Sequence, residues 1–218
     1  MLKDAEVVAL YHKVAAHAEE MVLEQEGLAL YKAACDATAV QQGIVVEIGS
    51  FKGTSTAMLG LGVNGLLIAI DPHEGHKDTT SKEHDEKPTI GVLYDTLRLM
   101  DIQHKVAILP ARSEAAYAAL SVVLKDIDLL FVDGGHTFEE AYADFFFYAK
   151  HIRPGGYLVA DDLGYATVRA AFDRWMKEVG WARGFRPIDL STWGLHDPEH
   201  NRLHEGCVAK MAFFQRSA

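Results

Sequence analysis

The chain has 218 residues, of which 49% are hydrophobic, and this size and composition predict a single α/β domain, 1–218, with a continuous core. Its formal net charge of −10 argues against a sequence-independent grip on nucleic acid, because phosphate contacts need clustered Lys and Arg. No apolar run approaches the length that spans a bilayer. We therefore expect a cytoplasmic protein that binds neither nucleic acid nor membrane. The sequence leaves open whether the protein forms a homo-oligomer.

Residues 1–42 predict two helices with a break at Gly27, because Ala, Glu, Leu and Val recur there at helical spacing. We expect them to form a helical cap on a core of residues 43–218. Most of this cap should be a packing layer against the sheet, and a contact from it to a bound ligand stays open. The two cysteines, Cys35 and Cys207, lack metal-ligand spacing and are predicted to be buried reduced thiols rather than a disulfide or a zinc pair.

The rest of the chain is organised around residues 44–56, which read I-V-V-E-I-G-S-F-K-G-T-S-T. The β-branched run 44–48 predicts a buried parallel strand, Gly49 and Gly53 predict a turn, and a helix should follow over 54–62. Strand, glycine turn and helix N-terminus form the ligand-binding corner of a doubly wound sheet. Gly49 can adopt positive φ and lets a ligand approach the backbone.

Several features of this corner discriminate between ligands. The loop lacks the middle glycine of the dinucleotide fingerprint, and no lysine follows Gly53 as a P-loop requires. Glu47 would repel a pyrophosphate but attract an ammonium group, which S-adenosylmethionine carries. Asp71 ends the next strand, 66–70, and lies 24 positions after Glu47, near the usual offset of a ribose-binding carboxylate. The alternative interpretations are that Gly49 and Gly53 serve packing only, and that Asp71 only forms a turn with Pro72.

Residues 72–88 are polar and aperiodic and predict a long exposed loop, a lid or a disordered segment, in which His73, His76 and His84 are solvated rather than metal-bound. Beyond it the pattern predicts helices and strands in alternation: helix 90–100, strand 106–109, helix 113–120, strand 127–133, helix 137–152, a turn at 153–156, strand 157–160, helix 167–179, and an antiparallel pair around 185–189 and 207–214. The side chains at core spacing on helix 137–152 are Phe138, Tyr142, Phe145, Phe146 and Ala149.

This order predicts a Rossmann-like, doubly wound α/β fold with a seven-stranded, mostly parallel sheet, an antiparallel strand near the C-terminus and helices on both faces. The carboxyl ends of its parallel strands should bring Asp133, Asp161 and Asp162 together. Such a cluster repels itself unless a cation lies within it, and oxygen ligands favour Mg²⁺ or another hard divalent ion. Taken singly, each acid could instead accept a hydrogen bond or cap a helix.

The pattern E-x-G-x-x-x-G at 47–53 resembles motif I of the class I methyltransferases. With F-V-D-G-G-H-T-F-E-E-A-Y-A-D at 131–144 and I-R-P-G-G-Y-L-V-A-D-D at 152–162, the chain resembles the family that contains natural-product sugar O-methyltransferases and cephalosporin-hydroxylase-like proteins. The resemblance implies metal ligation by Asp133, Asp161 and Asp162. The residues expected at the S-adenosylmethionine site are Glu47, Gly49, Ser50, Gly53, Asp71, Ser113 and Asp133.

We therefore expect a metal-dependent O-methyltransferase of a small hydroxylated acceptor, a sugar or another natural product, with S-adenosylmethionine as methyl donor. His136 lies three residues after Asp133 and is the candidate general base, with a brace of the G-G-H turn as its alternative role. Asp133 is expected to share in catalysis. The rival hypotheses are a metal-independent methyltransferase of another acceptor atom and a non-catalytic protein that binds S-adenosylmethionine.

Overall fold

The computed structural model describes residues 1–75, 88–196 and 202–218. Its sheet has the strand order β3-β2-β1-β4-β5-β8-β6, and the short strand β7 pairs with β8 beside this path. The strands are β1 (Gly43–Ile48), β2 (Gly65–Ile70), β3 (Val106–Leu109), β4 (Ile127–Val132), β5 (Ile152–Ala160), β6 (Phe185–Pro187), β7 (Cys207–Val208) and β8 (Met211–Arg216). The α-helices are α1 (Asp4–Ala18), α2 (Glu24–Ala37), α3 (Thr54–Gly62), α4 (Ile90–Leu99), α5 (Ser113–Leu120), α6 (Phe138–Tyr148) and α7 (Ala166–Trp175).

The first five strands are parallel, whereas β8 runs antiparallel to both β5 and β6. This arrangement confirms the predicted fold class: seven strands follow one path, and β8 is the antiparallel strand near the C-terminus. The strand predicted over 207–214 is divided by a turn at 209–210 into the two-residue strand β7 and the first part of β8. Every residue of β4 is buried, as the apolar run 129–132 requires of a central parallel strand, and the buried Asp128 pairs with Arg153 Nε at 2.6 Å.

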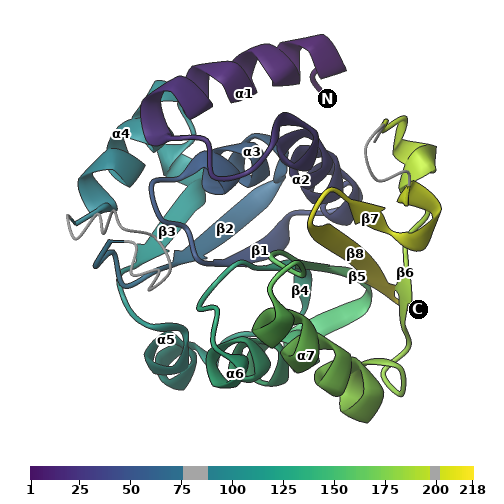
Figure 1. The fold of residues 1–218 in the computed structure, drawn as a ribbon. Coiled ribbons are helices and arrows are strands. Elements are labelled where there is room, and N and C mark those ends of the chain that lie inside the picture. Colours follow the sequence, from purple (N-terminus) through teal and green to yellow (C-terminus); the bar gives the residue numbers. More distant parts are fainter. Residues whose placement is uncertain (76–87, 197–201) are drawn as a thin grey trace.

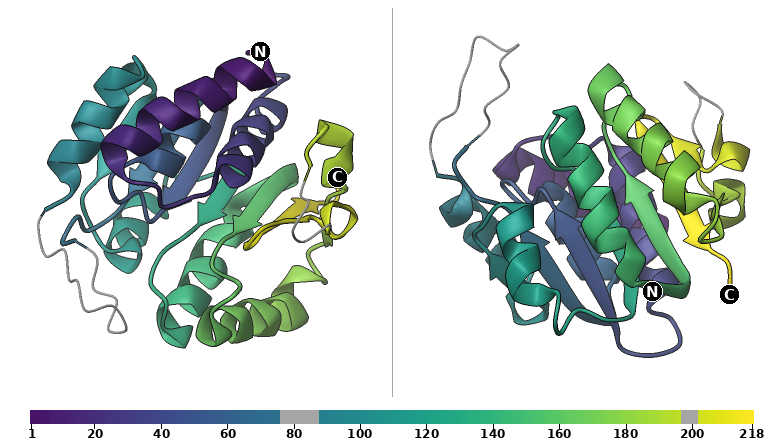
Figure 2. Two further views of the ribbon diagram at one scale, coloured as in Figure 1. Left: turned by 45° about the horizontal axis from the view of Figure 1, so that its top comes forward. Right: turned by 90° about the horizontal axis from the view of Figure 1, so that it is seen from below.

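Helices cover both faces of the sheet, α1 to α4 on one and α5 to α7 on the other (Figures 1 and 2). Alternate strand residues supply the two cores, because successive side chains of a strand point to opposite faces. Val45 and Leu67 pack under α1 to α3, while Val46 and Ile68 pack against the other layer. Each fully buried aliphatic side chain contributes about 1.5–3 kcal/mol to stability.

The N-terminal helices correct one prediction. Gly27 lies inside α2, and the break between the helices falls at residues 19–23, where Glu19 has a φ of 76°. A Cβ on Gly27 would lie 2.8 Å from Tyr11 Cδ2, so this glycine allows α1 and α2 to pack closely. The first turn of α2 is instead marked by Glu26, whose carboxylate accepts the backbone N–H of Leu23 at 2.8 Å.

The predicted helix and strand boundaries agree with the structure around the glycine corner and agree less well in the second half of the chain. Strand β5 begins at Ile152, so the R-P-G-G segment belongs to the strand, with an irregular register opposite 127–129. The helices predicted to end at 152 and 179 end at Tyr148 and Trp175, followed by a 3₁₀ turn and a π turn. Phe145 is buried as predicted, but Phe146 is 46% exposed and is not a core residue.

The predicted loop 72–88 lies largely outside the described residues, and so do His76 and His84. Its beginning is described, and there the prediction of a solvated His73 is wrong, because this side chain is buried. Both cysteines are free thiols; Cys207 is buried as predicted, whereas Cys35 is only half-buried. Among the helices in the described ranges, none has the length and apolar character of a transmembrane helix.

Candidate active site

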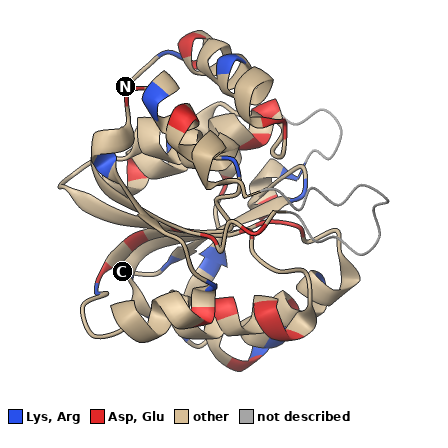
Figure 3. Cartoon of the chain, turned by 90° about the vertical axis from the view of Figure 1, so that its left-hand side faces the viewer, with Lys and Arg blue, Asp and Glu red and all other residues tan. Residues whose placement is uncertain are grey.

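The carboxyl ends of β1, β2, β4 and β5 lie along one edge of the sheet, because these strands pair in parallel. The chain moves outward through β2 and β3 on one side of β1 and through β4 and β5 on the other, so this edge contains the switch point where such folds bind ligands. Figure 3 shows acidic segments of the ribbon between the two helical layers, in addition to those on the outer helices.

Glu47 lies near the end of β1 and is completely buried. Ser55 Oγ, in the first turn of α3, donates a hydrogen bond of 2.6 Å to Glu47 Oε1. The second oxygen, Oε2, is buried and has no hydrogen-bond partner within the described part of the chain. Burial raises the pKa of Glu47 to about 7, although the Ser55 hydroxyl acts to lower it. The carboxyl group can therefore change protonation state near neutral pH.

Gly49 has a φ of 93°, and a Cβ on it would lie 1.7 Å from the carbonyl oxygen of Asp133. The ends of β1 and β4 approach so closely that a side chain at this position would collide with backbone. This contact is a structural reason for the glycine in addition to the ligand approach expected from the sequence. Gly53 has a φ of 98° at the start of α3, where a Cβ would meet Leu93 Cδ1 at 2.6 Å.

The Asp71 carboxylate connects the glycine loop to the end of β2. Its Oδ2 accepts the backbone N–H of Phe51 at 2.9 Å, and its Oδ1 accepts that of His73 at 2.6 Å. Each carboxylate oxygen has a second lone pair for a further donor. The buried His73 ring lies beside it, with Nδ1 2.9 Å from Thr89 Oγ1, and burial lowers the pKa of this histidine.

Ser113 begins α5, and its hydroxyl donates to Asp144 of α6. Tyr148 donates its hydroxyl hydrogen bond to the Ser113 carbonyl at 2.7 Å. Asp144 is buried below Gly134, where a Cβ would lie 2.7 Å from Asp144 Oδ2, and burial raises the pKa of this carboxyl group to about 7. The Ser113 side chain therefore connects two helices next to the β4 loop, and its contact with a cofactor stays a prediction.

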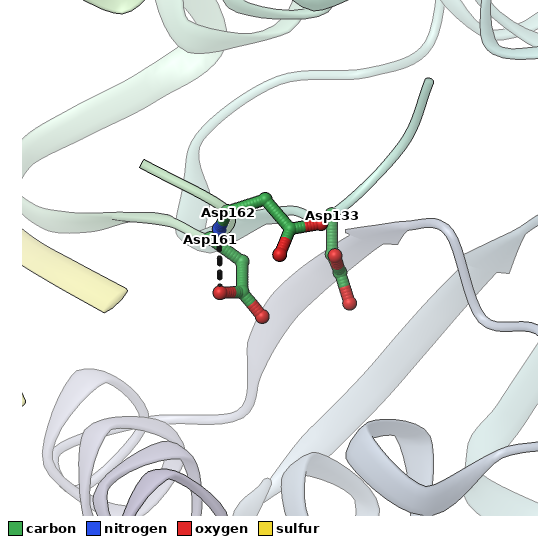
Figure 4. Close-up of side chains that lie close together, drawn as sticks. All are labelled: Asp133, Asp161 and Asp162. Carbon is green, nitrogen blue, oxygen red and sulfur yellow. Dashed lines mark hydrogen bonds between the residues drawn. The ribbon is translucent and has the colours of Figure 1, made fainter. Parts of the chain in front are cut away.

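The three predicted metal ligands do come together. Asp133 follows β4, and Asp161 and Asp162 follow β5; one carboxylate oxygen from each lies within 4.8 Å of the others. Figure 4 shows the three side chains at adjacent strand ends, with the backbone N–H of Asp162 donating to Asp161 Oδ1 at 2.6 Å. Burial, followed by the charges of the other two acids, raises the pKa of Asp133 well above its ordinary value. Burial also raises the pKa of Asp161, to about 7.

A lysine that the sequence analysis did not single out lies among these acids. Lys210, between β7 and β8, places its Nζ 2.9 Å from Asp162 Oδ1 and 3.4 Å from Asp161 Oδ2. Burial acts to lower the pKa of this lysine, but the three aspartates outweigh it and raise the pKa. The backbone N–H of Lys210 donates to Glu26 Oε1 at 3.1 Å, which links the cluster to α2.

The candidate base, His136, is also part of this cluster. Its Nε2 lies 2.7 Å from Asp162 Oδ2, and its ring stacks on Tyr165 with centroids 4.5 Å apart. Its backbone carbonyl accepts the Thr167 hydroxyl at 2.6 Å. Burial acts to raise the pKa of Asp162, but the hydrogen bond from His136 and the charge of Lys210 lower it to about 2. The predicted base thus has a carboxylate partner that orients its ring.

The donor set of the cluster fits a hard divalent cation. Three carboxylates converge, and Asp161 Oδ2 is buried and accepts no hydrogen bond from the described residues. Lys210 supplies a second, internal source of positive charge at the same oxygens. The arrangement of these carboxylates can therefore hold either a divalent metal ion or the Lys210 ammonium group.

Comparison with known families identifies the class of protein. Residues 46–163, just over half of the chain, match the family described as Methyltransferase domain, and the chain belongs to this family. The uncharacterized protein R132 of Acanthamoeba polyphaga mimivirus is 31% identical over 118 residues, which are 54% of this chain and 50% of that protein. The chain therefore aligns with about half the length of this relative.

Solved structures extend the comparison across the whole chain. The O-methyltransferase NovP matches with a TM-score of 0.71 at 12% identity, over 99% of this chain and 100% of NovP. The O-methyltransferase from Bacillus cereus, solved with SAH, has a TM-score of 0.63 at 14% identity, over 86% of this chain and 84% of its own. TomG from Streptomyces achromogenes, solved with SAM, has a TM-score of 0.63 at 16% identity, over 100% of this chain and 91% of its own. The class I methyltransferase fold predicted from the sequence is confirmed.

Sequence reasoning missed Lys210, Glu26 and Tyr165. Lys210 is 48 positions after Asp162, at a turn between two short strands, and no local motif marks it. Only the antiparallel insertion of β8 beside β5 brings it to the switch point. If β8 is assumed to insert antiparallel beside β5, a basic residue in the turn before β8 predicts a positive charge near the acidic cluster.

Proposed function

We propose that this methyltransferase moves the methyl group of S-adenosylmethionine to a hydroxyl of a small acceptor, with Mg²⁺ or another hard divalent cation at Asp133, Asp161 and Asp162. The observation that carries the proposal is the convergence of these carboxylates, with oxygens within 4.8 Å of one another, at the edge that also contains the glycine corner. Oxygen donors alone suit such an ion.

The cofactor assignment rests on the corner itself. Asp71 retains acceptor capacity for ribose hydroxyls, and Ser50 Oγ is buried without a hydrogen-bond partner within the described residues. Glu47 places a carboxyl group behind the loop, which favours a cationic ligand over a pyrophosphate. Gly49, Gly53, Ser113 and Asp133 complete the proposed cofactor site. SAH and SAM in the structures of the Bacillus cereus enzyme and TomG support this choice.

The reaction would proceed by in-line attack of the acceptor oxygen on the methyl carbon. The O–CH₃ bond forms as the S–CH₃ bond breaks, which releases S-adenosylhomocysteine and the methylated acceptor. The bound cation would hold the acceptor oxygen and lower the pKa of its hydroxyl. His136 takes the proton: its Nε2 faces Asp162 at 2.7 Å, so the carboxylate favours the tautomer with hydrogen on Nε2, and Nδ1 is then the basic atom.

A binding and turnover experiment tests this proposal. Calorimetry should detect S-adenosylmethionine and S-adenosylhomocysteine, and methyl transfer to a panel of sugars and other hydroxylated natural products should stop in EDTA and return with Mg²⁺. The Asp161→Ala variant should lose activity and metal response but keep cofactor affinity. Cofactor affinity without turnover on any acceptor would instead support a binding protein.

A second candidate is a metal-independent methyltransferase, and the position of Lys210 favours it. Its ammonium group, 2.9 Å from Asp162 and 3.4 Å from Asp161, is a cation already at the cluster. Full activity in EDTA would support this second candidate and would contradict the metal dependence proposed above.

A cytoplasmic location, which two free thiols favour, and an acceptor drawn from sugars or natural products belong to the same proposal.

A further inference from the structure

We propose that Lys210 is an internal competitor for the metal, so that a divalent cation binds to the acidic cluster only by displacing the lysine ammonium. This inference rests on the proposed metal site and adds a residue that controls its occupancy. Lys210 comes from the β7–β8 turn, outside the strand ends that supply the carboxylates.

The contacts of the ammonium group overlap with those that a metal needs. Lys210 Nζ lies 2.9 Å from Asp162 Oδ1 and 3.4 Å from Asp161 Oδ2. Asp161 Oδ2 is one of the buried oxygens without a hydrogen bond in the described residues, so the ion pair with Lys210 is its electrostatic partner. A divalent ion that approached these oxygens to bonding distance would stand next to a like charge.

The charge balance of the cluster favours exchange rather than coexistence. Three aspartates converge, and a fourth carboxylate, the buried Glu26, adjoins Lys210 and accepts its backbone N–H at 3.1 Å. A single ammonium neutralises only part of this charge, whereas a divalent ion neutralises more and binds several oxygens at once. The lysine thus lowers the repulsion among the acids without the metal and opposes the metal when it arrives.

The lysine can leave without unfolding its surroundings. Its backbone N–H is held by Glu26 Oε1 at 3.1 Å, and β7 and β8 are paired on either side of the turn. The side chain is 36% exposed, so its flexible methylene chain can carry the ammonium into solvent while the turn stays in place. Only side-chain torsions need to change.

Direct metal binding tests the proposal without an activity readout. Mn²⁺ affinity would be measured by calorimetry and electron paramagnetic resonance for the wild type, Lys210→Met and Lys210→Arg. The methionine variant keeps the length of the side chain without its charge and should bind Mn²⁺ about 5–150-fold more tightly, the usual range of coupling between two ligands. The arginine variant should stay close to the wild type. Lys177→Met, which removes an exposed charge after α7, is the matched control and should leave the affinity unchanged.

A second measurement uses the unmodified protein. The rate at which an amine reagent labels Lys210, followed by mass spectrometry, should rise several-fold when Mg²⁺ is added, while the rate at Lys177 stays constant. Equal Mn²⁺ affinity in wild type and Lys210→Met, or metal binding with unchanged labelling, overturns the role of Lys210 and leaves the metal site intact. No Mn²⁺ binding by either protein overturns the metal site together with this inference.

Discussion

The two halves of the candidate site satisfy their carboxylates in different ways. In the glycine corner, Glu47 and Asp71 receive hydrogen bonds from Ser55, eight residues away, and from backbone N–H groups of the adjacent loops. In the acidic cluster, Asp162 pairs with His136 and Lys210, which come from a different loop and from the C-terminal hairpin. The corner is thus completed within residues 47–73, whereas the cluster also needs Lys210, 48 positions after Asp162.

The largest expected effect concerns the cluster. His136→Ala should lower kcat by about 10²–10⁴ and leave cofactor affinity almost unchanged, because it removes the proposed base from the acceptor side only. Steady-state kinetics and calorimetry on S-adenosylhomocysteine measure the two quantities. His104→Ala, at an exposed histidine, is the control. If the variant loses stability while kcat per folded molecule stays within a few-fold, His136 is a structural brace of the G-G-H turn, and another residue is the general base.

The next effect tests the contact between the two halves. Gly49→Ala should lower the free energy of unfolding by about 2–4 kcal/mol, since its Cβ would collide with the Asp133 carbonyl and its φ of 93° is strained for alanine. Urea denaturation measures the change. Gly164→Ala, where a Cβ would meet no heavy atom within 4 Å, should stay within about 0.5 kcal/mol. Equal effects in both variants would show that the strand ends can separate freely.

A smaller effect is expected on cofactor affinity alone. Asp71→Ala should weaken binding of S-adenosylmethionine by about 1–3 kcal/mol, the scale of hydrogen bonds to a charged group, while Asp95→Ala on the exposed side of α4 should not. Calorimetry on both variants provides the measurement. Tight NAD binding by the wild type, with none of the methionine cofactor, would refute the assignment of the corner.

The last effect is similar in size and is a pH dependence of stability in the Glu47→Gln variant. The folded protein raises the pKa of Glu47 from 4.5 to about 7, so it binds this proton more tightly than the unfolded chain does. The wild type therefore loses stability as the pH rises from 4.5 to 7, and the glutamine variant avoids that loss. The variant should match the wild type below pH 4.5 and exceed it by about 3 kcal/mol above pH 7, since each unit of the shift is worth about 1.4 kcal/mol. Chemical denaturation across this range checks it, and a pH-independent difference would contradict the buried ionisation.

The sequence predicted the helices and strands best where the local residue pattern is compatible with only one structure. The β1–α3–β2 unit has nearly the predicted boundaries, since a β-branched run, two glycines and a helical start follow one another directly. Gly27 was misread because a helical glycine can mark either a break or a close helix contact, and only the 2.8 Å approach of Tyr11 decides. His73 was misread because polar neighbours predict exposure, whereas its ring packs beside Thr89.

The same limit applies to the candidate site. The convergence of Asp133, Asp161 and Asp162 followed from parallel strand ends, a rule of topology that periodicity in the sequence can supply. Their counter-charge did not follow, because Lys210 reaches them through an antiparallel strand whose register no local pattern encodes.

By itself, then, the sequence determined the doubly wound sheet, the glycine corner and the meeting of the three acids, since each depends on residues within one strand–loop–helix unit or on the order of such units. Only the tertiary structure decided which charges face each other: the lysine among the aspartates, the Asp162 partner of His136 and the burial of Glu47. Pairing energies and pKa values depend on distance and burial in space, and two residues 48 positions apart have no fixed distance until the sheet is assembled.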